Sequence, residues 1–273
     1  MWDSARTQIM AILNITPDSF SGDGLLAKRA SLPGVIKYAQ GLAAQGADII
    51  DVGGESSRPG AKSISVKEEL KRTIPVIEKL SASIRIPVSI DTYKPEVARR
   101  ALNAGASVVN DITGLRNPRM IKIIARSSAR VVIMHMKGMP RNMQKNPEYE
   151  SLIGEIIRYL QAAINRAEAG GINKKRVIID PGIGFGKTIR HNLEILQRLE
   201  EFKILGCPIL VGTSRKSFIG QVLNLPNPKE RLIPTIATLA VAIMKGANIL
   251  RVHDVKSAVQ AARITEAVIK GNY

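Results

Sequence analysis

The sequence predicts an α/β protein that folds as a (β/α)8 TIM barrel. The chain has 273 residues, close to the roughly 250 residues of a barrel of this kind. Short runs rich in Val and Ile recur along it, and each is followed by a helical pattern. Nearly continuous apolar runs are typical of parallel strands that are buried on both faces. The expected strands span residues 8–13, 48–53, 87–91, 107–112, 130–135, 177–182, 208–213 and 249–253.

The segments between these strands carry helix signals. Ser65 and Glu68 have the spacing of a capping box, and two prolines suit a first helical turn, Pro95 and Pro118. Pro75 lies inside a helical pattern and is expected to kink or interrupt it. Three glycines that follow apolar-periodic stretches are expected to end helices, namely Gly46, Gly105 and Gly271.

The longest segment between predicted strands runs from 136 to 176. It is predicted to combine a loop rich in Met, Pro and Asn with a long helix that begins near Pro147. No low-complexity segment or charge block marks a boundary anywhere in the sequence. Residues 1–273 are therefore predicted to form one domain.

The chain is strongly basic, with 40 Lys and Arg residues, 23 Asp and Glu residues and a net charge of +17. Such a charge suits nucleic-acid binding, steering of an anionic small molecule, or a basic solvated surface. The basic residues are spread over many segments, and aromatic residues make up only 4% of the chain, too few for base-stacking platforms. We therefore favour a basic solvated surface and expect no nucleic-acid partner.

Cysteine use and hydropathy bear on the compartment. The single cysteine, Cys207, leaves no internal disulfide framework and favours the reducing cytoplasm. No apolar run approaches the ~18 residues of a membrane span, and Met1-Trp2-Asp3 do not begin a signal peptide. We expect a cytoplasmic protein without a membrane partner.

Polar side chains lie at or near the carboxyl end of every predicted strand. Any one of them could be a helix cap or a satisfied turn residue, but capping does not explain the same pattern on all strands. In a barrel, active sites form at this end. The residues are Asn14, Asp51, Asp91, Asn110, Asp111, His135, Asp180, Thr213-Ser214-Arg215-Lys216, Arg251 and His253.

Three segments point to an anionic group on the substrate. The loop in 48–61 is interpreted either as a flexible lid that contacts an anion or as an ordinary βα loop. Ser214, Arg215 and Lys216 lie where a strand meets a helix N-terminus, which favours anions. Arg251 and His253 alternate along the last strand, so both are expected to point into the barrel mouth and to suit a phosphate.

The glycine-rich segment 180–188 reads DPGIGFGKT. It is not a Walker phosphate loop, because Pro181 stands where that motif needs glycine, and its glycines lack the spacing of a dinucleotide fingerprint. The glycines are expected to let the backbone pass close under a ligand while Asp180 points into the site.

Several long motifs, in order, resemble the dihydropteroate synthase family over nearly the whole chain. They are ILNITPDSFS at 12–21, DVGGESSRPGA at 51–61, SIDTYKPEVA at 89–98, VNDI at 109–112, DPGIGFGKT at 180–188, VGTSRKSFIG at 211–220 and RVHDV at 251–255. The resemblance implies a TIM barrel that usually forms homodimers. It also implies condensation of 6-hydroxymethyl-7,8-dihydropterin diphosphate with p-aminobenzoate, with Mg2+, and competition by sulfonamides.

The resemblance implies a role for individual residues. It assigns the pterin to Asp91, Asn110, Met134, Asp180, Phe185, Gly212 and Lys216. It assigns the diphosphate to Asn14, Arg251 and His253, with Asn14 also the expected Mg2+ ligand. It assigns p-aminobenzoate to Ser57, Arg58 and Ser214. The catalytic set it implies is Asp91, Lys216, Arg251 and His253.

The first loop is expected to close over the site through Asp18, Ser19 and Phe20. It reads SFSGDG where the family commonly has SFSDGG, so the sequence leaves open whether Asp18 or Asp23 assists the metal. Two alternatives to the synthase remain. One is a pterin-binding methyltransferase barrel, which serves a corrinoid and has no use for the SSRPG, TSRKSF and RVHDV segments. The other is a non-catalytic barrel that binds pterin or nucleic acid.

Overall fold

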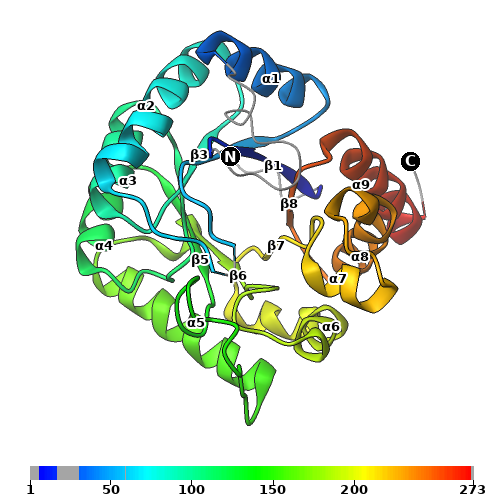
Figure 1. Ribbon diagram of the computed structural model, residues 1–273. Coiled ribbons are helices and arrows are strands. Elements are labelled where there is room, and N and C mark those ends of the chain that lie inside the picture. The colour runs from blue at the N-terminus through cyan, green and yellow to red at the C-terminus, as the bar shows by residue number, and fades with distance from the viewer. Residues whose placement is uncertain (1–5, 17–30, 59, 272–273) are drawn as a thin grey trace.

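The computed structural model describes residues 6–16, 31–58 and 60–271 of the chain. Within these residues, eight strands form one parallel sheet. Figure 1 shows the strands at the centre and the helices in a ring around them. The strands are β1 (Gln8–Asn14), β2 (Ile49–Gly53), β3 (Val88–Asp91), β4 (Val108–Asp111), β5 (Arg130–Met134), β6 (Val177–Asp180), β7 (Leu210–Val211) and β8 (Ile249–Val252).

Helices connect successive strands, as the sequence predicts. They are α1 (Leu32–Ala44), α2 (Val66–Ser83), α3 (Pro95–Asn103), α4 (Pro118–Ala125), α5 (Leu152–Ala169), α6 (Ile189–Gln197), α7 (Ser217–Leu223), α8 (Leu232–Met244) and α9 (Val255–Lys270). Three short 3-10 helices join them, η1 (Lys174–Arg176), η2 (Leu199–Leu205) and η3 (Pro228–Arg231). Among the described residues, no helix combines the length and apolar character that crossing a membrane requires.

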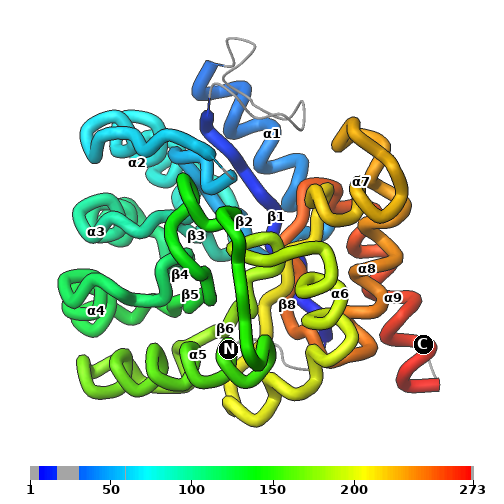
Figure 2. The backbone as a smooth tube through the Cα atoms, turned by 60° about the horizontal axis from the view of Figure 1, so that its bottom comes forward, coloured from blue at the N-terminus to red at the C-terminus, as the bar shows by residue number. Residues whose placement is uncertain are grey.

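The sheet closes on itself. Its strand order is β6-β5-β4-β3-β2-β1-β8-β7, and a parallel bridge between Ile179 and Ile209 joins the two outer strands. The Ile179 N–H donates to the carbonyl of Pro208 at 2.9 Å. Figure 2 shows the same barrel from the side, with the helices outside the strands. The predicted TIM barrel is confirmed.

Two layers of side chains fill the barrel interior. Alternate residues along a strand face opposite sides, so a residue two positions farther on faces the same interior. The lower layer is an apolar cluster of Met10, Ile49, Val108, Val132, Ile178, Leu210 and Ile249. Two positions along each strand, the upper layer contains Ile12, Asp51, Asn110, Met134, Asp180, Gly212 and Arg251. Four of these seven strands, β2, β4, β6 and β8, thus change from an apolar to a polar residue within one step of the alternation.

Six of the predicted strands agree with the structure to within one residue at each end. The other two are shorter than expected. β6 ends at Asp180 instead of 182, because Gly182 turns the chain with a φ of +71°. β7 covers only Leu210–Val211 instead of 208–213, because Pro208 has no N–H for the ladder.

Two predictions for α2, the capping box at its start and the effect of Pro75 inside it, agree with the structure only in part. Ser65 Oγ accepts the Glu68 N–H at 3.2 Å, but the Glu68 carboxylate pairs with Arg72 at 2.8 Å instead of completing a capping box. Of the two outcomes expected at Pro75, a kink or an interruption, the interruption does not occur, since α2 runs unbroken from Val66 to Ser83. A proline removes one helical hydrogen bond, and the buried face of α2 holds the helix together, through Thr73, Val76, Ile77 and Leu80.

The long helix α5 starts later than expected. It begins at Leu152 instead of near Pro147, because the Glu155 carboxylate accepts the N–H groups of Glu150 and Ser151 at 2.8 and 3.2 Å. The other helix signals are confirmed. Pro95 and Pro118 occupy first turns, and positive φ angles follow three helices at Gly46, Gly105 and Gly271.

Candidate active site

A cavity of about 490 Å3 lies at the carboxyl ends of the strands. Residues on the end of each strand, or in the loop that follows it, contribute to its wall. The cavity brings together every predicted ligand-binding residue outside the first loop. These residues are Asn14, Ser57, Arg58, Asp91, Asn110, Met134, Asp180, Phe185, Gly212, Ser214, Lys216, Arg251 and His253.

Arg251 forms the centre of an ionic cluster on the cavity floor. Its Nε donates to Asp51 Oδ2 at 2.7 Å, and its Nη2 donates to Asp91 Oδ2 at 2.6 Å. Asn110 Nδ2 donates to the same oxygen of Asp51 at 3.1 Å. Because these residues come from β8, β2, β3 and β4, the cluster fixes one side of the barrel mouth as a unit.

Burial sets the protonation of this cluster. It raises the pKa of Asp91 above its usual range, while the Arg251 charge opposes that shift. Burial acts to lower the pKa of Arg251, but the carboxylates of Asp51 and Asp91 raise it above its ordinary value. Arg251 therefore stays charged, and its Nη1 group makes no hydrogen bond to any residue that the structure describes. That group is available to an anionic ligand.

Asp180 and Lys216 form the opposite wall. Asp180 Oδ1 accepts the Gly182 N–H at 2.7 Å. Lys216 Nζ donates to the Ile183 carbonyl and lies 4.9 Å from the centroid of the Phe185 ring. Burial raises the pKa of Asp180 and lowers the pKa of Lys216 to about 8, and each group's charge opposes the shift of the other. A carboxylate and an ammonium group thus flank the same space.

His253 is held by Ser214. The Ser214 hydroxyl lies 2.9 Å from His253 Nδ1 and accepts the backbone N–H of His253 at 3.2 Å. Burial lowers the pKa of His253 to about 3, and the charges of Arg251, Arg215 and Arg58 add to the effect. The ring is therefore neutral at pH 7. With Nδ1 accepting the Ser214 proton, the ring proton belongs on Nε2, where it can serve as a donor.

The loop after β2 forms a third wall. Ser56, Ser57 and Arg58 line the cavity, which agrees both with a lid and with an ordinary βα loop. Farther along this loop, the Gly60 N–H donates to the carbonyl of Pro140 at 3.1 Å. The loop therefore leans against the segment that follows β5.

Four predicted strand-end residues do not line the cavity, namely Asp51, Thr213, His135 and Asp111. His135 is 5% exposed, and its Nδ1 lies 3.0 Å from Lys187 Nζ. Asp111 accepts the N–H groups of Thr113 and Leu115 at 2.8 and 3.1 Å. His135 and Asp111 both face away from the barrel interior, since their neighbours Asn110 and Met134 face into it. Asp111 acts as a turn residue, which is the alternative that the sequence left open for any single strand-end residue.

The glycines of 180–188 pack mainly against the protein itself. A Cβ at Gly182 would lie 1.9 Å from the carbonyl oxygen of His135, and one at Gly186 would lie 2.7 Å from that of Lys137. Gly184 lines the cavity. The expectation that the glycines pass under a ligand therefore applies to Gly184, whereas the other two allow close contact with the segment after β5.

The residues missed as site residues from the sequence include four charged ones at or beside the cavity. Asp51 was noted as a strand-end residue, and its partnership with Arg251 joins positions 200 residues apart. Glu55 and Arg231 line the cavity, and Lys187 Nζ donates to the Phe185 carbonyl at 3.0 Å. Glu55 had a sequence signal, as an acidic residue inside the motif DVGGESSRPGA. The other contacts depend on how distant loops meet. The predicted loop residues Asp18, Ser19 and Phe20, with Asp23, lie outside the described residues.

The cavity suits a magnesium ion that retains most of its own ligands. No cluster of three or more His, Cys, Asp or Glu side chains that could hold a metal occurs among the described residues. Asn14 Oδ1 and Asp91 Oδ2 lie 3.2 and 3.8 Å from the point that a Cβ on Gly53 would occupy. Magnesium often takes only one or two protein oxygens, with waters and phosphates completing the shell. The residues present therefore fit such an ion.

A TIM barrel with acidic, basic and amide groups around one cavity defines a class of enzyme that binds a polar heterocycle at its mouth. The comparisons give this class a name. The pterin binding enzyme family matches residues 10–253, which covers most of the chain and all but the ends of the barrel.

Relatives and solved structures specify the family further. A dihydropteroate synthase of Synechocystis sp. is 48% identical over 264 residues, covering 96% of this chain and 90% of the relative. A Yersinia pestis dihydropteroate synthase with a sulfonamide drug complex has a TM-score of 0.94 at 44% identity, covering 98% of this chain and 96% of that one. A Xanthomonas albilineans dihydropteroate synthase in complex with 7,8-dihydropteroate has a TM-score of 0.85 at 37% identity, with 98% and 94% covered.

The chain belongs to the dihydropteroate synthase family. It is therefore an enzyme of the transferase class, and the methyltransferase and non-catalytic alternatives lose their basis.

Proposed function

We propose that this chain joins 6-hydroxymethyl-7,8-dihydropterin diphosphate to p-aminobenzoate, giving 7,8-dihydropteroate and diphosphate. The observation that carries the proposal is that the residues expected for the pterin, the diphosphate and p-aminobenzoate line a single cavity. The relatives support it, because their solved structures hold a sulfonamide drug in one case and 7,8-dihydropteroate in another.

The pterin binds between the two charged walls in this proposal. A carboxylate accepts two adjacent N–H donors of an aminopyrimidinone edge side by side, and Asp180 has that place. Asn110 donates and accepts at another edge, and Lys216 donates to the pterin carbonyl or a ring nitrogen. Met134, Phe185 and Gly212 shape the slot, and the last allows close approach.

The diphosphate binds against Asn14, Arg251 and His253. Arg251 offers its Nη1 group, and neutral His253 offers the proton on Nε2. Asn14 supplies an amide oxygen for Mg2+. When bound, Mg2+ neutralises charge that builds up on the leaving diphosphate.

p-Aminobenzoate lies between Ser57 and Arg58 on one side and Ser214 on the other. The Ser214 hydroxyl is already oriented by His253 at 2.9 Å, so the aminobenzoate and diphosphate sites share one hydrogen-bonded pair. Sulfonamides occupy the same place and compete with p-aminobenzoate.

The reaction needs no side-chain nucleophile. The bond between the pterin methylene and the diphosphate oxygen breaks, and its electron pair leaves with diphosphate. The resulting cation is delocalised into the dihydropterin and stabilised by the carboxylate of Asp91, whose ionised form the Arg251 charge favours against the effect of burial. The amine of p-aminobenzoate attacks the methylene carbon and then loses a proton. The chain's contribution is positioning and electrostatic stabilisation.

A diphosphate-release assay tests the proposal. Purified protein is given the pterin diphosphate and Mg2+, with and without p-aminobenzoate. We expect release that depends on p-aminobenzoate, together with 7,8-dihydropteroate among the products. Binding of the pterin without any release of diphosphate would contradict the synthase activity and leave a pterin-binding barrel.

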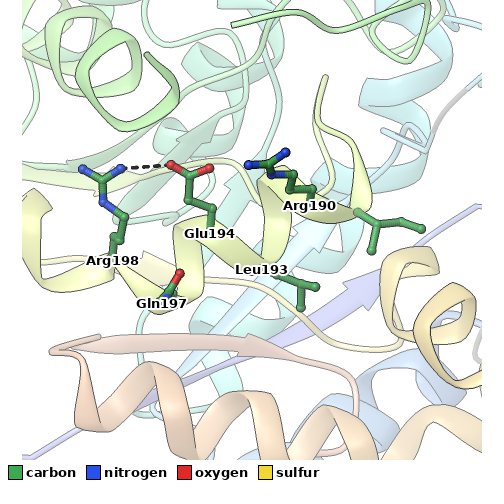
Figure 3. Close-up of a pocket in the computed structure, with 6 residues that line it drawn as sticks. Arg190, Leu193, Glu194, Gln197 and Arg198 are labelled. Atoms are coloured by element: carbon green, nitrogen blue, oxygen red, sulfur yellow. Dashed lines mark hydrogen bonds and ion pairs between the residues drawn. The ribbon is translucent and has the colours of Figure 1, made fainter. Parts of the chain in front are cut away.

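A homodimer and a cytoplasmic location are part of the proposal. α6 packs against α8, and both expose apolar side chains, among them Leu193 at 45% and Met244 at 65%. Figure 3 shows the hollow on α6, of about 630 Å3, that Leu193 lines between Arg190 and Arg198. A second copy of the chain would cover this face. The lone cysteine, Cys207, agrees with a reducing compartment.

Sedimentation equilibrium tests the dimer. The wild type should sediment at twice the chain mass, and Leu193→Glu combined with Met244→Glu should sediment as a monomer. A wild type that stays monomeric at the concentrations used for the assay would contradict the dimer without affecting the proposed reaction.

A further inference from the structure

Glu55 joins the two ends of the loop that carries the proposed aminobenzoate residues. This loop follows β2 and includes Ser57 and Arg58. Glu55 Oε2 accepts the Ile64 N–H at 2.8 Å, so one carboxylate connects the start of the loop to the residue just before the cap of α2. Glu55 itself lines the cavity. The Glu55 carboxylate thereby ties the two ends of the loop together.

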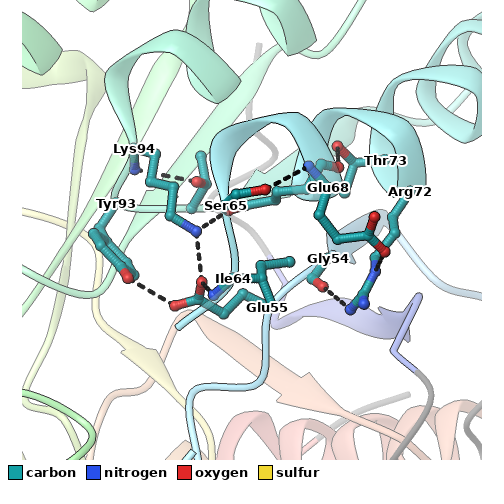
Figure 4. A network of polar contacts seen from close by, with 11 residues as sticks. Gly54, Glu55, Ile64, Ser65, Glu68, Arg72, Thr73, Tyr93 and Lys94 are labelled. Atoms are coloured by element: carbon teal, nitrogen blue, oxygen red, sulfur yellow. Dashed lines mark hydrogen bonds and ion pairs between the residues drawn. The ribbon is translucent and has the colours of Figure 1, made fainter. Parts of the chain in front are cut away.

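Lys94 connects this carboxylate to the body of the barrel. Its Nζ lies 2.5 Å from Glu55 Oε2 and 2.5 Å from Glu69 Oε2. The hydroxyl of the adjacent Tyr93 donates to Glu55 Oε1 at 2.7 Å. Figure 4 shows Glu55 between Lys94 and Tyr93, with Ile64 beside it. Both oxygens of Glu55 are therefore fixed by groups outside its loop.

The cluster is deeply placed. The side chains of Lys94, Glu55 and Glu69 are 12%, 11% and 1% exposed. Buried ion pairs often stabilise a fold no more than apolar residues of the same size, and they are better explained where they fix a geometry. Lys94 and Glu69 do not line the cavity, whereas the loop that Glu55 anchors does. The geometry that this cluster fixes is therefore the position of the loop relative to the cavity.

The pterin and diphosphate walls are held by other contacts. Asp91 and Asn110 are fixed by the cluster around Arg251 and Asp51, and Asp180 is fixed by Gly182. The side chains of the two networks share no hydrogen bond among the described residues, and the link between them runs through Thr92, whose N–H donates to the Asn110 carbonyl at 3.1 Å and whose Oγ1 accepts the Lys94 N–H at 3.2 Å. A change at Lys94 should therefore move the aminobenzoate wall and leave the other walls in place.

We propose that Lys94 and Glu69 are positioning residues that act through Glu55 to place Ser57 and Arg58 for p-aminobenzoate. This inference rests on the proposed function, which assigns the aminobenzoate to that loop. Loss of the Lys94 charge frees the Glu55 carboxylate and loosens both ends of the loop. The affinity for p-aminobenzoate falls, and the affinity for the pterin diphosphate does not.

Steady-state kinetics of the full chain with Mg2+ test this. In Lys94→Met, the KM for p-aminobenzoate should rise about tenfold or more, while the KM for the pterin diphosphate stays within about twofold. Lys94→Arg should return the KM for p-aminobenzoate to within about threefold of wild type, because it restores the charge between the two carboxylates. Equal rises in both KM values, or no rise in either, would overturn the inference.

Two further variants keep the test decisive. If Lys94→Met does not fold, Glu69→Gln weakens the same anchor while keeping an oxygen toward Lys94, and it should give the same KM split to a smaller degree. Glu266→Gln is the control for lost stability, since Glu266 pairs with Arg263 at 2.7 Å far from the cavity. It should leave both KM values unchanged. A wild type without aminobenzoate-dependent release refutes the proposed function, whereas an active wild type without the KM split refutes this inference alone.

Discussion

The lower and upper layers of the barrel interior come from the same strands, but only the upper layer contains charged and amide side chains. In β6, Ile178 belongs to the apolar lower layer, and Asp180 belongs to the wall of the cavity. In β8, the same step leads from Ile249 to Arg251. The backbone is regular through both layers, so the change lies entirely in the side chains.

This contrast shows how stability and function are divided along a strand. The lower layer removes apolar surface from water and stabilises the barrel. The upper layer contains buried charges, which are costly unless each has a partner. Arg251 pairs with both Asp51 and Asp91, so removing any one of the three leaves a buried charge without one of its partners. Mutations in the two layers should therefore fail in different ways.

The largest effect is expected from Arg251→Met. It leaves the carboxylates of Asp51 and Asp91 buried without their cation, which should lower the free energy of unfolding by about 3–5 kcal/mol. Diphosphate release should also be lost. Urea unfolding and the release assay measure the two effects. Adding Asp51→Asn should recover part of the stability and none of the activity. If Arg251→Met were as stable as wild type, the ionic cluster would not be a unit.

Asp180→Ala should act on binding more than on folding. The substitution removes two charge-assisted hydrogen bonds to the pterin edge, so the Kd for the pterin diphosphate should rise about a hundredfold or more. Isothermal titration calorimetry measures this. Near-normal affinity would exclude the role proposed for Asp180 and would place the pterin against another wall.

Alternation along the strands explains what the sequence could and could not predict. The barrel followed from the Val and Ile runs, and the cavity residues followed from motifs at the ends of those runs. The same alternation separates Asn110 from Asp111, since adjacent residues face opposite sides, and this rule would have removed Asp111 and His135 from the candidates.

Contacts between distant loops had no such signal. Lys94 meets Glu55 and Glu69 only because the loops after β2 and β3 fold together, and nothing in the local sequence gives that approach. Pro75 shows the reverse case, in which a strong local signal for a break is overridden by the buried face of α2. Tertiary packing determined both outcomes.

The pH dependence of binding should show whether the pterin diphosphate requires the charged form of Lys216. Burial lowers the pKa of Lys216 to about 8, so the ammonium group is lost as the pH rises through that value. Above about pH 8, the affinity for the pterin diphosphate should fall, approaching tenfold for each further pH unit. Calorimetry between about pH 6.5 and about pH 9.5 measures this. Lys216→Gln should bind more weakly and show no such decline, and parallel declines in both proteins would assign the titration to another group.

The smallest effect is expected two residues below Asp180. Ile178→Val removes one methylene group from the apolar layer, which should lower the free energy of unfolding by about 1 kcal/mol. Because Ile178 does not reach the cavity, kcat and both KM values should stay within about twofold of wild type. Urea unfolding and steady-state kinetics on one preparation measure both. A shift in either KM as large as that of an upper-layer variant would mean that packing in the lower layer sets the positions of the charges above it. The two layers would then differ in chemistry, but both would determine function.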